Sequence, residues 1–265
     1  MVLEVTGIPD IKTRPDGRRL CTVKCTGYSD EYTYTGEFEE GTDGELILSG
    51  YGKLLSKDCE KTIYEGNFRY GMYEGKGIYY FPSGSIYKGD FRHGMFEGKG
   101  IYYFLSGSIY EGDFRHGMFE GKGIYHFPNG DIYDGDFRHD IFEGKGTYHF
   151  PNGDRYEGNW ENDVKNGWGT YYDPDGGKYE GNWENDVKNG WGTYYDPNGD
   201  RYEGNWENNK MHGQGIFTDH RGRVYERLYS EDSLKEETAM SQEFYGEDGE
   251  IGSKHYGERM KLYTV

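Results

Sequence analysis

Residues 156–174 read YEGNWENDVKNGWGTYYDP, and residues 179–197 repeat these nineteen letters without a change. The copies start 23 residues apart, and a tyrosine recurs at the same step before and after them. A catalytic pocket needs different residues that converge from different parts of a chain, whereas tandem copies build a continuous surface. The pattern therefore favours a repeat array over an enzyme. The recurring tyrosines are Tyr64, Tyr87, Tyr110, Tyr133, Tyr156, Tyr179, Tyr202 and Tyr225.

Within each repeat the residue types alternate with period two, which is typical of β-strands. In the second regular repeat, Tyr87, Gly89 and Phe91 fall on one face of the predicted strand, while Lys88 and Asp90 fall on the other. A polar loop and a Gly-x-Gly-x-Tyr segment follow, and a glycine-containing turn such as PSGS or PNGD then reverses the chain. We predict an all-β fold, an elongated antiparallel meander of tandem β-hairpins with a period of 23.

Glycine recurs inside the predicted strands, where it usually weakens them. We expect an aromatic ring to lie across the bare glycine backbone, where it fills the missing volume and fixes the register. On this hypothesis Gly100→Val harms folding more than Lys99→Ala. The repeat positions assigned to this packing are Tyr64, Gly66, Tyr87, Gly89, Tyr110, Gly112, Tyr133, Gly135, Tyr156, Gly158, Tyr179, Gly181, Tyr202 and Gly204.

Composition alone would indicate a disordered chain. Leu, Ile, Val and Phe make up about a sixth of the residues and the net charge is −18, a combination common in disordered proteins. The periodic tyrosines and tryptophans argue against disorder, because they supply a large amphipathic area. The three cysteines are too few for a disulfide framework. We see no signal segment and no long apolar run, so we expect a soluble, intracellular protein.

The motif Tyr-Glu-Gly-Asn-Phe/Trp followed by Gly-x-Gly-x-Tyr resembles the MORN-repeat family, over about residues 34–225. It recurs seven times with the same spacing, from Tyr64 to Tyr202. A looser, degenerate repeat at 34–63 precedes the regular repeats of 64–225. The resemblance implies a non-catalytic β-hairpin array that scaffolds protein–protein contacts, often in cilia, flagella and other cytoskeletal structures. Membrane-lipid association is also attributed to this family.

We expect three parts along the chain. Residues 1–33 would form an N-terminal cap or an extra hairpin, because a PDG turn precedes an alternating stretch there. Residues 34–225 would form the MORN-repeat array. Residues 226–265 would form an acidic C-terminal tail or a short capping helix, since Ser233-Leu-Lys-Glu236 matches a capping box. A partner-binding tail is the alternative for this last part.

Most repeats carry an apolar pair where the family commonly has basic and polar residues before Gly-x-Gly. These side chains either fold over their own hairpins and complete a thin core, or form an exposed ribbon that docks a helix or another chain. The residues leave both alternatives open. The partner-binding candidates are Met72, Tyr73, Met95, Phe96, Met118, Phe119, Ile141 and Phe142, together with Arg92 and Arg115.

Basic residues also recur once per repeat. They could bind acidic protein segments or phosphoinositide headgroups, or they could form an ion-paired, solvated surface with nearby glutamates. The acidic repeats beyond residue 156 oppose contact with nucleic acid or anionic membrane. We expect no metal, since histidines about 10 Å apart cannot share one ion, and no cofactor, since no phosphate-loop motif is present. The basic column consists of Arg69, Arg92, Arg115 and Arg138 with His93, His116 and His139.

The repeats from residue 156 onward differ from the earlier ones. Trp160 and Trp183 replace phenylalanine, Trp168 and Trp191 follow the loop glycine, and a Val-Lys pair replaces the Met/Phe pair. Two surfaces of this kind suggest two partners, or a partner and a self-contact. A recent duplication without new function would leave the same pattern.

These features predict a non-enzymatic structural scaffold that binds other proteins. The resemblance implies an axonemal setting in a cilium or flagellum, with radial-spoke subunits as partners. A second copy of the chain, in a homodimer, is the other partner that we consider. The localisation would be cytoplasmic and cytoskeletal. The alternative is a peripheral membrane adaptor that binds phosphoinositides, which needs a basic, salt-sensitive surface in which this sequence is poor.

Overall fold

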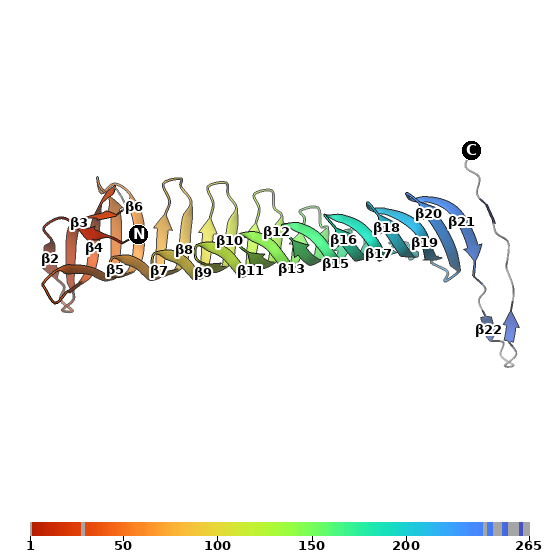
Figure 1. Cartoon of the computed structure of the whole chain (residues 1–265), viewed down its shortest axis with the longest axis horizontal. Coiled ribbons are helices and arrows are strands. Elements are labelled where there is room, and N and C mark those ends of the chain that lie inside the picture. Colours follow the sequence, from red (N-terminus) through yellow and green to blue (C-terminus); the bar gives the residue numbers. More distant parts are fainter. Residues whose placement is uncertain (1, 28–29, 241–242, 246–250, 254–259, 262–265) are drawn as a thin grey trace. The chain divides into compact units, whose positions relative to one another are not determined.

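The molecule is an all-β protein. Every regular element among the described residues is a strand, and sequential strands pair antiparallel as an open meander (Figure 1). The fold class predicted from the sequence is therefore confirmed. The chain divides into two compact units, Met1–Ile141 and Phe142–Val265. The computed structural model describes residues 2–27, 30–240, 243–245, 251–253 and 260–261.

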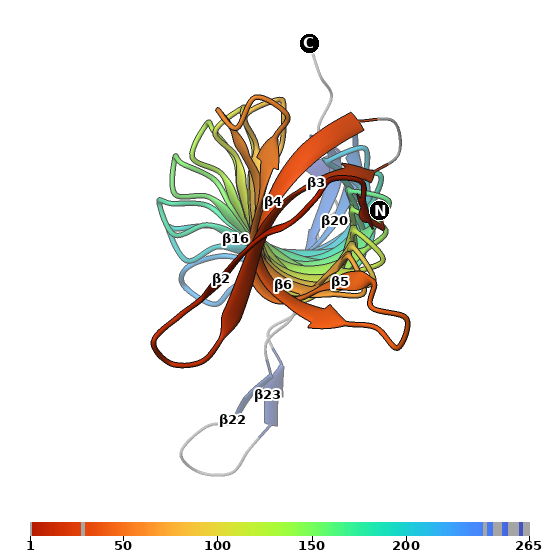
Figure 2. The same ribbon diagram turned by 90° about the vertical axis from the view of Figure 1, so that its left-hand side faces the viewer.

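Unit 1 contains the first twelve strands. β1 and β2 both pair with β3, and from β3 onward each strand pairs with the next. The strands are curved, as Figure 2 shows. Their bounds are β1 (Glu4–Val5), β2 (Asp10–Thr13), β3 (Arg19–Gly27), β4 (Asp30–Glu40), β5 (Leu46–Ser56), β6 (Thr62–Arg69), β7 (Met72–Tyr80), β8 (Ile86–Arg92), β9 (Met95–Tyr103), β10 (Ile109–Arg115), β11 (Met118–His126) and β12 (Ile132–Arg138).

Unit 2 continues the hairpin pattern. β13 begins at the last residue of unit 1, and each strand from β13 to β21 pairs with the next. β24 pairs with β21, and β22 pairs with β23. The bounds are β13 (Ile141–His149), β14 (Arg155–Glu161), β15 (Val164–Tyr172), β16 (Lys178–Glu184), β17 (Val187–Tyr195), β18 (Arg201–Glu207), β19 (Lys210–Thr218), β20 (Val224–Ser230), β21 (Ser233–Ala239), β22 (Glu243–Tyr245), β23 (Ile251–Ser253) and β24 (Met260–Lys261).

Two kinds of turn alternate along the repeats. Between β8 and β9 the loop has only two residues, His93 and Gly94, with φ of 51° and 79°. Positive φ at both central positions is the mark of a type I′ turn, whose twist matches that of the paired strands. The connection between β9 and β10 is wider. There the Phe104 N–H donates to the Ser108 carbonyl at 3.0 Å.

The sequence-based prediction of a polar loop before each Gly-x-Gly was wrong. The type I′ turn ends at Gly94, so β9 already begins at Met95, and both members of the apolar pair Met95 and Phe96 belong to a strand. Neighbouring residues of a strand point to opposite faces of the sheet. The apolar pairs therefore cannot form a single ribbon.

A tyrosine packed over two glycines forms the core of each repeat. Tyr87 is fully buried, and its ring lies against Gly89 of its own strand and Gly100 of β9. A Cβ added at Gly100 would meet the Tyr87 hydroxyl oxygen at 2.5 Å and Cε2 at 2.6 Å. Only glycine fits at this position, as predicted from the sequence. The same arrangement recurs in both units, for example at Tyr110 and Tyr179.

A β-bulge beside these glycines interrupts the strand ladder. The register of β8 against β9 shifts between Gly89 and Asp90, and Gly98 in the bulge has a φ of 65°, a left-handed value that favours glycine. The Tyr87 hydroxyl donates to the Asp90 carbonyl at 2.8 Å. Burial raises the pKa of Tyr87 well above its usual range, so the hydroxyl stays protonated and keeps donating.

Adjacent hairpins are joined by rings and by turns. The Tyr87 ring meets Phe114 of the next repeat edge-on, with 4.9 Å between the centroids. The type I′ turn of each repeat also contacts the repeat before it, since the His93 N–H donates to the Glu74 carboxylate at 2.9 Å. The next turn residue donates to a backbone carbonyl of the same earlier strand. Contacts between neighbouring repeats therefore carry much of the stability.

The residues before the first regular repeat add strands to the first edge of the sheet. β3 pairs with β4 from Leu20 to Gly27 and buries Cys21, Val23 and Cys25. Burial raises the pKa of both thiols to about 11, so they remain protonated near neutral pH.

The predicted helix at residues 233–236 is wrong, because Ser233–Ala239 forms β21 and pairs with β20. Glu231 and Asp232, with φ of 50° and 63°, form another type I′ turn, so the hairpin pattern continues past residue 225. Pairing with the sheet outweighs the local preference of a capping box. Part of the predicted tail, including residues 246–250 and 254–259, lies outside the described residues.

Candidate functional site

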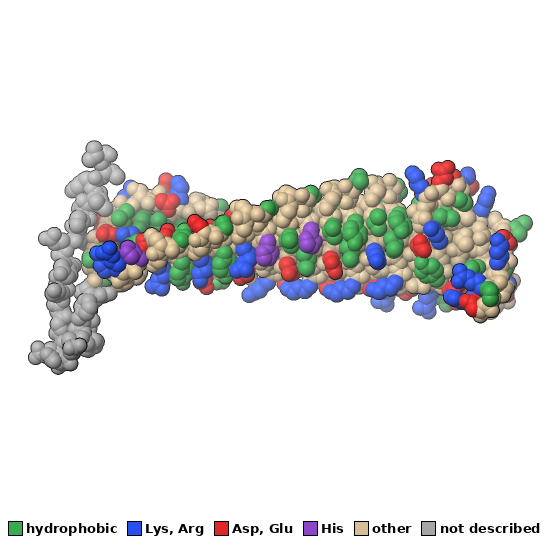
Figure 3. Space-filling view, turned by 180° about the vertical axis from the view of Figure 1, so that it is seen from behind, with side chains coloured by type: hydrophobic (Ala, Val, Ile, Leu, Met, Phe, Trp, Pro, Cys, Tyr) green, Lys and Arg blue, Asp and Glu red, His purple; other side chains and the backbone are tan. Residues whose placement is uncertain are grey.

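The face of unit 1 opposite the tyrosine rings is open. Because side chains alternate along a strand, Lys88, Asp90 and Arg92 of β8 point away from the core, onto what we call the polar face. The space-filling view shows basic side chains in a row beside hydrophobic ones over the N-terminal unit (Figure 3). Among the described residues, no helix or second sheet layer is present to cover this face.

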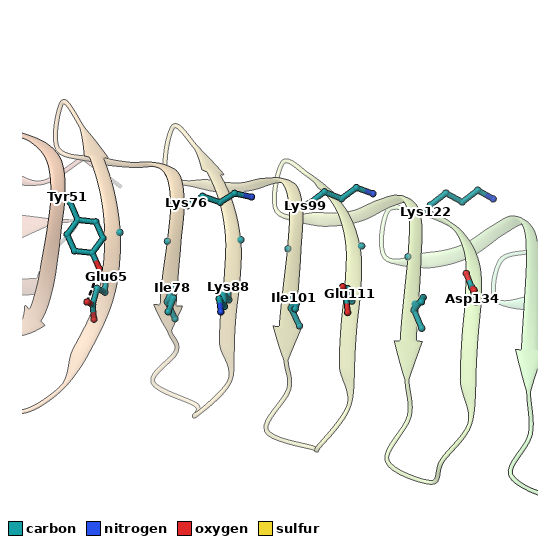
Figure 4. Close-up of a pocket in the computed structure, with 17 residues that line it drawn as sticks. Tyr51, Glu65, Lys76, Ile78, Lys88, Lys99, Ile101, Glu111, Lys122 and Asp134 are labelled. Carbon is teal, nitrogen blue, oxygen red and sulfur yellow. Dashed lines mark hydrogen bonds between the residues drawn. The ribbon is translucent and has the colours of Figure 1, made fainter.

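A shallow groove of about 850 Å³ runs across the strands of the polar face (Figure 4). Its floor is the bare backbone of glycine pairs such as Gly89 and Gly100, the same glycines that carry the tyrosine ring on the other face. At one end the Tyr51 hydroxyl donates to the Glu65 carboxylate at 2.9 Å, which raises the pKa of Tyr51. We call this the isoleucine groove, and its central side chains are Ile78, Lys88, Ile101, Glu111 and Ile124.

Lysines along one side of the groove reach from one repeat to the next. Lys99 Nζ lies 2.7 Å from the Asp113 carboxylate, and the same distance separates Lys76 from Asp90 and Lys122 from Asp136. The lysine side chains are 67–72% exposed, so each pair contributes little to stability, about 0–1 kcal/mol. Their charges are nevertheless matched within the protein.

The aromatic members of the predicted apolar pairs pack into the core. Tyr73, Phe96 and Phe119 each stack on the tyrosine of their own hairpin, with ring centroids 3.8–4.0 Å apart. Phe142 meets Trp160 of unit 2 edge-on at 5.6 Å. These four residues are not on the polar face, so they stand apart from the other partner-binding candidates.

The methionines and arginines of the prediction lie together on the polar face. Each methionine is directly opposite an arginine in the strand register, and Met95 is 43% exposed. Ile141 takes the methionine position one repeat later, at the end of unit 1. We call the column the Arg/Met row, and it consists of Arg69, Met72, Arg92, Met95, Arg115 and Met118.

The histidines of the basic column occupy turn positions. His93, His116 and His139 all have positive φ, and their backbone N–H groups donate to Glu74, Glu97 and Glu120 of the preceding repeat. These glutamates therefore hold the backbone of the turns. Within the described part of the chain, no group of three or more His, Cys, Asp and Glu could hold a metal ion. That part also contains no helix long and apolar enough to cross a membrane.

Unit 2 places a lysine where unit 1 places the stacked phenylalanine. Burial lowers the pKa of Lys165, and the Asp186 carboxylate 4.0 Å away partly offsets this effect. Lys188 is buried in the same way one repeat later. The sequence analysis noted the Val-Lys pair but not its burial, which only the aromatic positions of the neighbouring strands reveal. The Lys165 ammonium lies 5.1–5.8 Å from the ring centroids of Phe150, Tyr156, Tyr171 and Trp183.

Comparison with protein families identifies the repeats. The MORN repeat model matches seven consecutive segments that together cover more than half of the chain, so the chain belongs to the MORN-repeat family. The first match begins at Tyr64, as expected from the sequence. The matched residues are 64–86, 87–109, 110–132, 133–155, 156–178, 179–201 and 202–222.

Comparison with individual proteins gives only distant similarities. No curated protein matches the chain significantly. The SAS-4 (dCPAP) TCP domain of Drosophila melanogaster, solved in complex with a proline-rich motif of Ana2 (dSTIL), has 12% identity and a TM-score of 0.39 over 73% of this chain and 89% of that one. A streptogramin B lyase has 12% identity and a TM-score of 0.15 over 99% and 88%. Similarities this low say nothing about function.

Proposed function

We propose that this MORN-repeat protein is a structural scaffold that holds partner proteins along the polar face of unit 1. The observation that carries the proposal is the Arg/Met row, in which exposed arginines and partly exposed methionines return once per repeat. Methionine and arginine are both enriched at protein interfaces, because one adapts its shape and the other makes several hydrogen bonds.

The repeat spacing supports a scaffold in particular. Each repeat advances by two strands, or about 9.6 Å, so equivalent contacts are offered at regular intervals. Several modest contacts made by one partner add up to stable placement, because after the first contact the others form at high effective concentration. The isoleucine groove lies on the same face and offers apolar area between charged side chains.

We further propose the axoneme of a cilium or flagellum as the setting, with radial-spoke subunits among the partners. This step rests on the resemblance to ciliary MORN proteins. The test is to express the tagged protein in a ciliated cell and to extract the membranes with non-ionic detergent. We expect the protein to stay with the microtubules. Release with the lipid, or absence from the cilium, would contradict this setting.

The same assay tests the surface. Replacing Met95 and Met118 by Ser removes two apolar anchors from the polar face without touching the stacked rings. We expect the double variant to melt at the wild-type temperature and to be lost from the detergent-extracted axoneme. Lys99→Ala, which changes an ion-paired residue of the same face, is the matched control and should be retained. Full retention of the methionine variant would argue against the Arg/Met row as the docking surface.

The observations favour a protein partner over a phosphoinositide. Three lysines of the polar face, Lys76, Lys99 and Lys122, are already paired with aspartates at 2.7 Å, which reduces the positive charge that this face offers to a phosphorylated headgroup. A second copy of the chain remains a proposed partner, and the oligomeric state in solution tests it.

A further inference from the structure

Two of the five tryptophans stand on the surface of unit 2. Trp168 and Trp191 are 49% and 45% exposed, whereas Trp160, Trp183 and Trp206 are at most 7% exposed. Each of the three buried indoles donates its N–H to a backbone carbonyl at 3.2–3.3 Å. The core thus uses three tryptophans and leaves two on the opposite face of the sheet of unit 2. Large exposed aromatic side chains of this kind mark binding surfaces.

The exposed indoles alternate with side-chain amides. Trp168 lies opposite Asn182 in the register of β15 and β16, and Trp191 lies opposite Asn205 in that of β17 and β18. In unit 1 the same repeat positions hold the lysine–aspartate pairs, so this face differs in chemistry between the units. We call the column the tryptophan row, and it consists of Asn159, Trp168, Asn182, Trp191, Asn205 and Gln214.

The spacing of the row matches a polyproline II helix. One strand separates β15 from β17, so the two indoles recur after two interstrand steps, about 9.6 Å. A polyproline II helix advances about 9.3 Å in one turn of three residues. Prolines at every third position would therefore meet successive indoles. The backbone of such a helix has no internal hydrogen bonds, which leaves its carbonyls free to accept from the asparagine amides.

The charges beside the row favour a basic ligand. On one side, Glu157, Glu180 and Glu203 form ion pairs with bases of their own strands at 3.0–3.6 Å. On the other side, Glu161 and Glu184 accept hydrogen bonds from Asn166 and Asn189. No ion pair joins either of these two glutamates to a lysine or arginine of the described residues. Their negative charge is unmatched among the described residues and would attract arginine or lysine.

We propose that the tryptophan row of unit 2 binds a basic, proline-rich protein segment in the polyproline II conformation. This site is independent of the Arg/Met row and goes beyond the general scaffold function, because it names the chemistry of a second partner. A linear glycan could also stack on two indoles, but a neutral glycan has no positive charge to match these glutamates.

The test uses the full-length protein and a labelled peptide with proline at every third position and arginine at both ends. We expect saturable binding by fluorescence anisotropy, together with protection of the exposed tryptophans from a soluble quencher. The variant Trp168→Gln/Trp191→Gln should bind at least about tenfold more weakly. It should keep its fold, because Gln214 occupies the equivalent position one repeat later.

Two further variants sharpen the result. Lys99→Gln changes the equivalent position in unit 1 and should leave peptide binding unchanged. Glu184→Gln should weaken binding and reduce its dependence on salt. The proposal is overturned if the wild-type protein does not bind, if the double variant binds equally well, or if alanine can replace the prolines without loss. Binding of a linear oligosaccharide in place of the peptide would overturn it as well.

Discussion

At the scale of single residues, the glycine pairs serve both faces of the sheet. Gly89 and Gly100 accommodate the Tyr87 ring on one face and form the floor of the isoleucine groove on the other. A substitution at either glycine would therefore disturb the core and the candidate site together. Binding is better tested at side chains such as Ile101, which belong to the polar face alone.

One buried hydroxyl, that of Tyr73, departs from the regular pattern of the core. It is buried and has no hydrogen-bond partner among the described residues, while Phe96 and Phe119 hold the equivalent positions of the next repeats. An unsatisfied buried hydroxyl costs about 1–3 kcal/mol. We therefore expect Tyr73→Phe to raise the free energy of unfolding by roughly 1 kcal/mol, measured by urea denaturation.

The matched control for this change is Tyr87→Phe. The Tyr87 hydroxyl donates to the Asp90 carbonyl at 2.8 Å, so its removal should lower the free energy of unfolding by about 1 kcal/mol. A loss of stability in both variants would show that the Tyr73 hydroxyl is satisfied in solution.

At the scale of elements, the type I′ turns change character along the chain. The second turn residue is glycine up to Gly117, whereas Asp140 takes its place one repeat later and accepts the Phe119 N–H at 2.7 Å. A Cβ at Gly117 would meet nothing within 4 Å, and Asn209 shows that asparagine adopts this conformation, with a φ of 70°. Gly117→Asn should therefore stabilise the protein by about 0.5–1 kcal/mol through one added hydrogen bond.

Thermal unfolding measures this effect. Gly117→Ala is the control, because it adds a Cβ at positive φ without an acceptor and should be neutral or destabilising. Equal stabilisation by alanine and asparagine would mean that the hydrogen bond is not the cause.

The buried lysines make the free energy of unfolding of unit 2 depend on pH in the alkaline range. Burial lowers the pKa of Lys165 below its usual 10.5, so the unfolded chain binds more protons than the folded one in the range between the two values. Stability contributed by this group therefore rises with pH towards 10.5. Met211 holds the equivalent position two repeats later, so Lys165→Met should fold and be about 1–2 kcal/mol more stable at neutral pH.

Comparing the wild-type protein with the Lys165→Met variant isolates the contribution of the Lys165 ammonium group. Ionisation of tyrosines affects both alike, so we expect the advantage of Lys165→Met in urea denaturation to shrink as the pH rises towards 10.5. An advantage that stays constant with pH would show that the pKa of Lys165 is the same in the folded and the unfolded chain.

The sequence was sufficient where one local rule governs the structure. The period of 23 and the alternation of Tyr87, Gly89 and Phe91 predicted the hairpins and the glycine packing. The sequence was insufficient where contacts with other strands determine the conformation or the burial of a residue. The two-residue turn at His93 places Met95 and Phe96 on opposite faces, and pairing with β20 turns the Ser233 segment into a strand. The burial of Lys165 depends on a ring of its own strand and on rings from two other strands and a wide turn.

At the scale of the whole molecule, the two units repeat the same core packing and differ on the sheet face opposite that core. Unit 1 carries the Arg/Met row and lysine–aspartate pairs, and unit 2 carries the tryptophan row beside unmatched glutamates. The core can be repeated because tyrosine and glycine fill it in every hairpin, while residues of the other face change without altering the fold. This separation allows one repeat to be copied and its surface to diverge.

Because each repeat contacts mainly its neighbours, a local defect should stay local. In Gly100→Val the new side chain collides with the Tyr87 ring, an overpacking that costs about 1–3 kcal/mol or more. Hydrogen exchange followed by mass spectrometry should then show lost protection over residues 64–132 and unchanged protection over 202–222. Lys99→Ala, which removes only an exposed ion pair, should leave the pattern as in wild type. Equal loss of protection in both units would mean that the molecule unfolds as one cooperative block, and that nearest-neighbour contacts do not describe its stability.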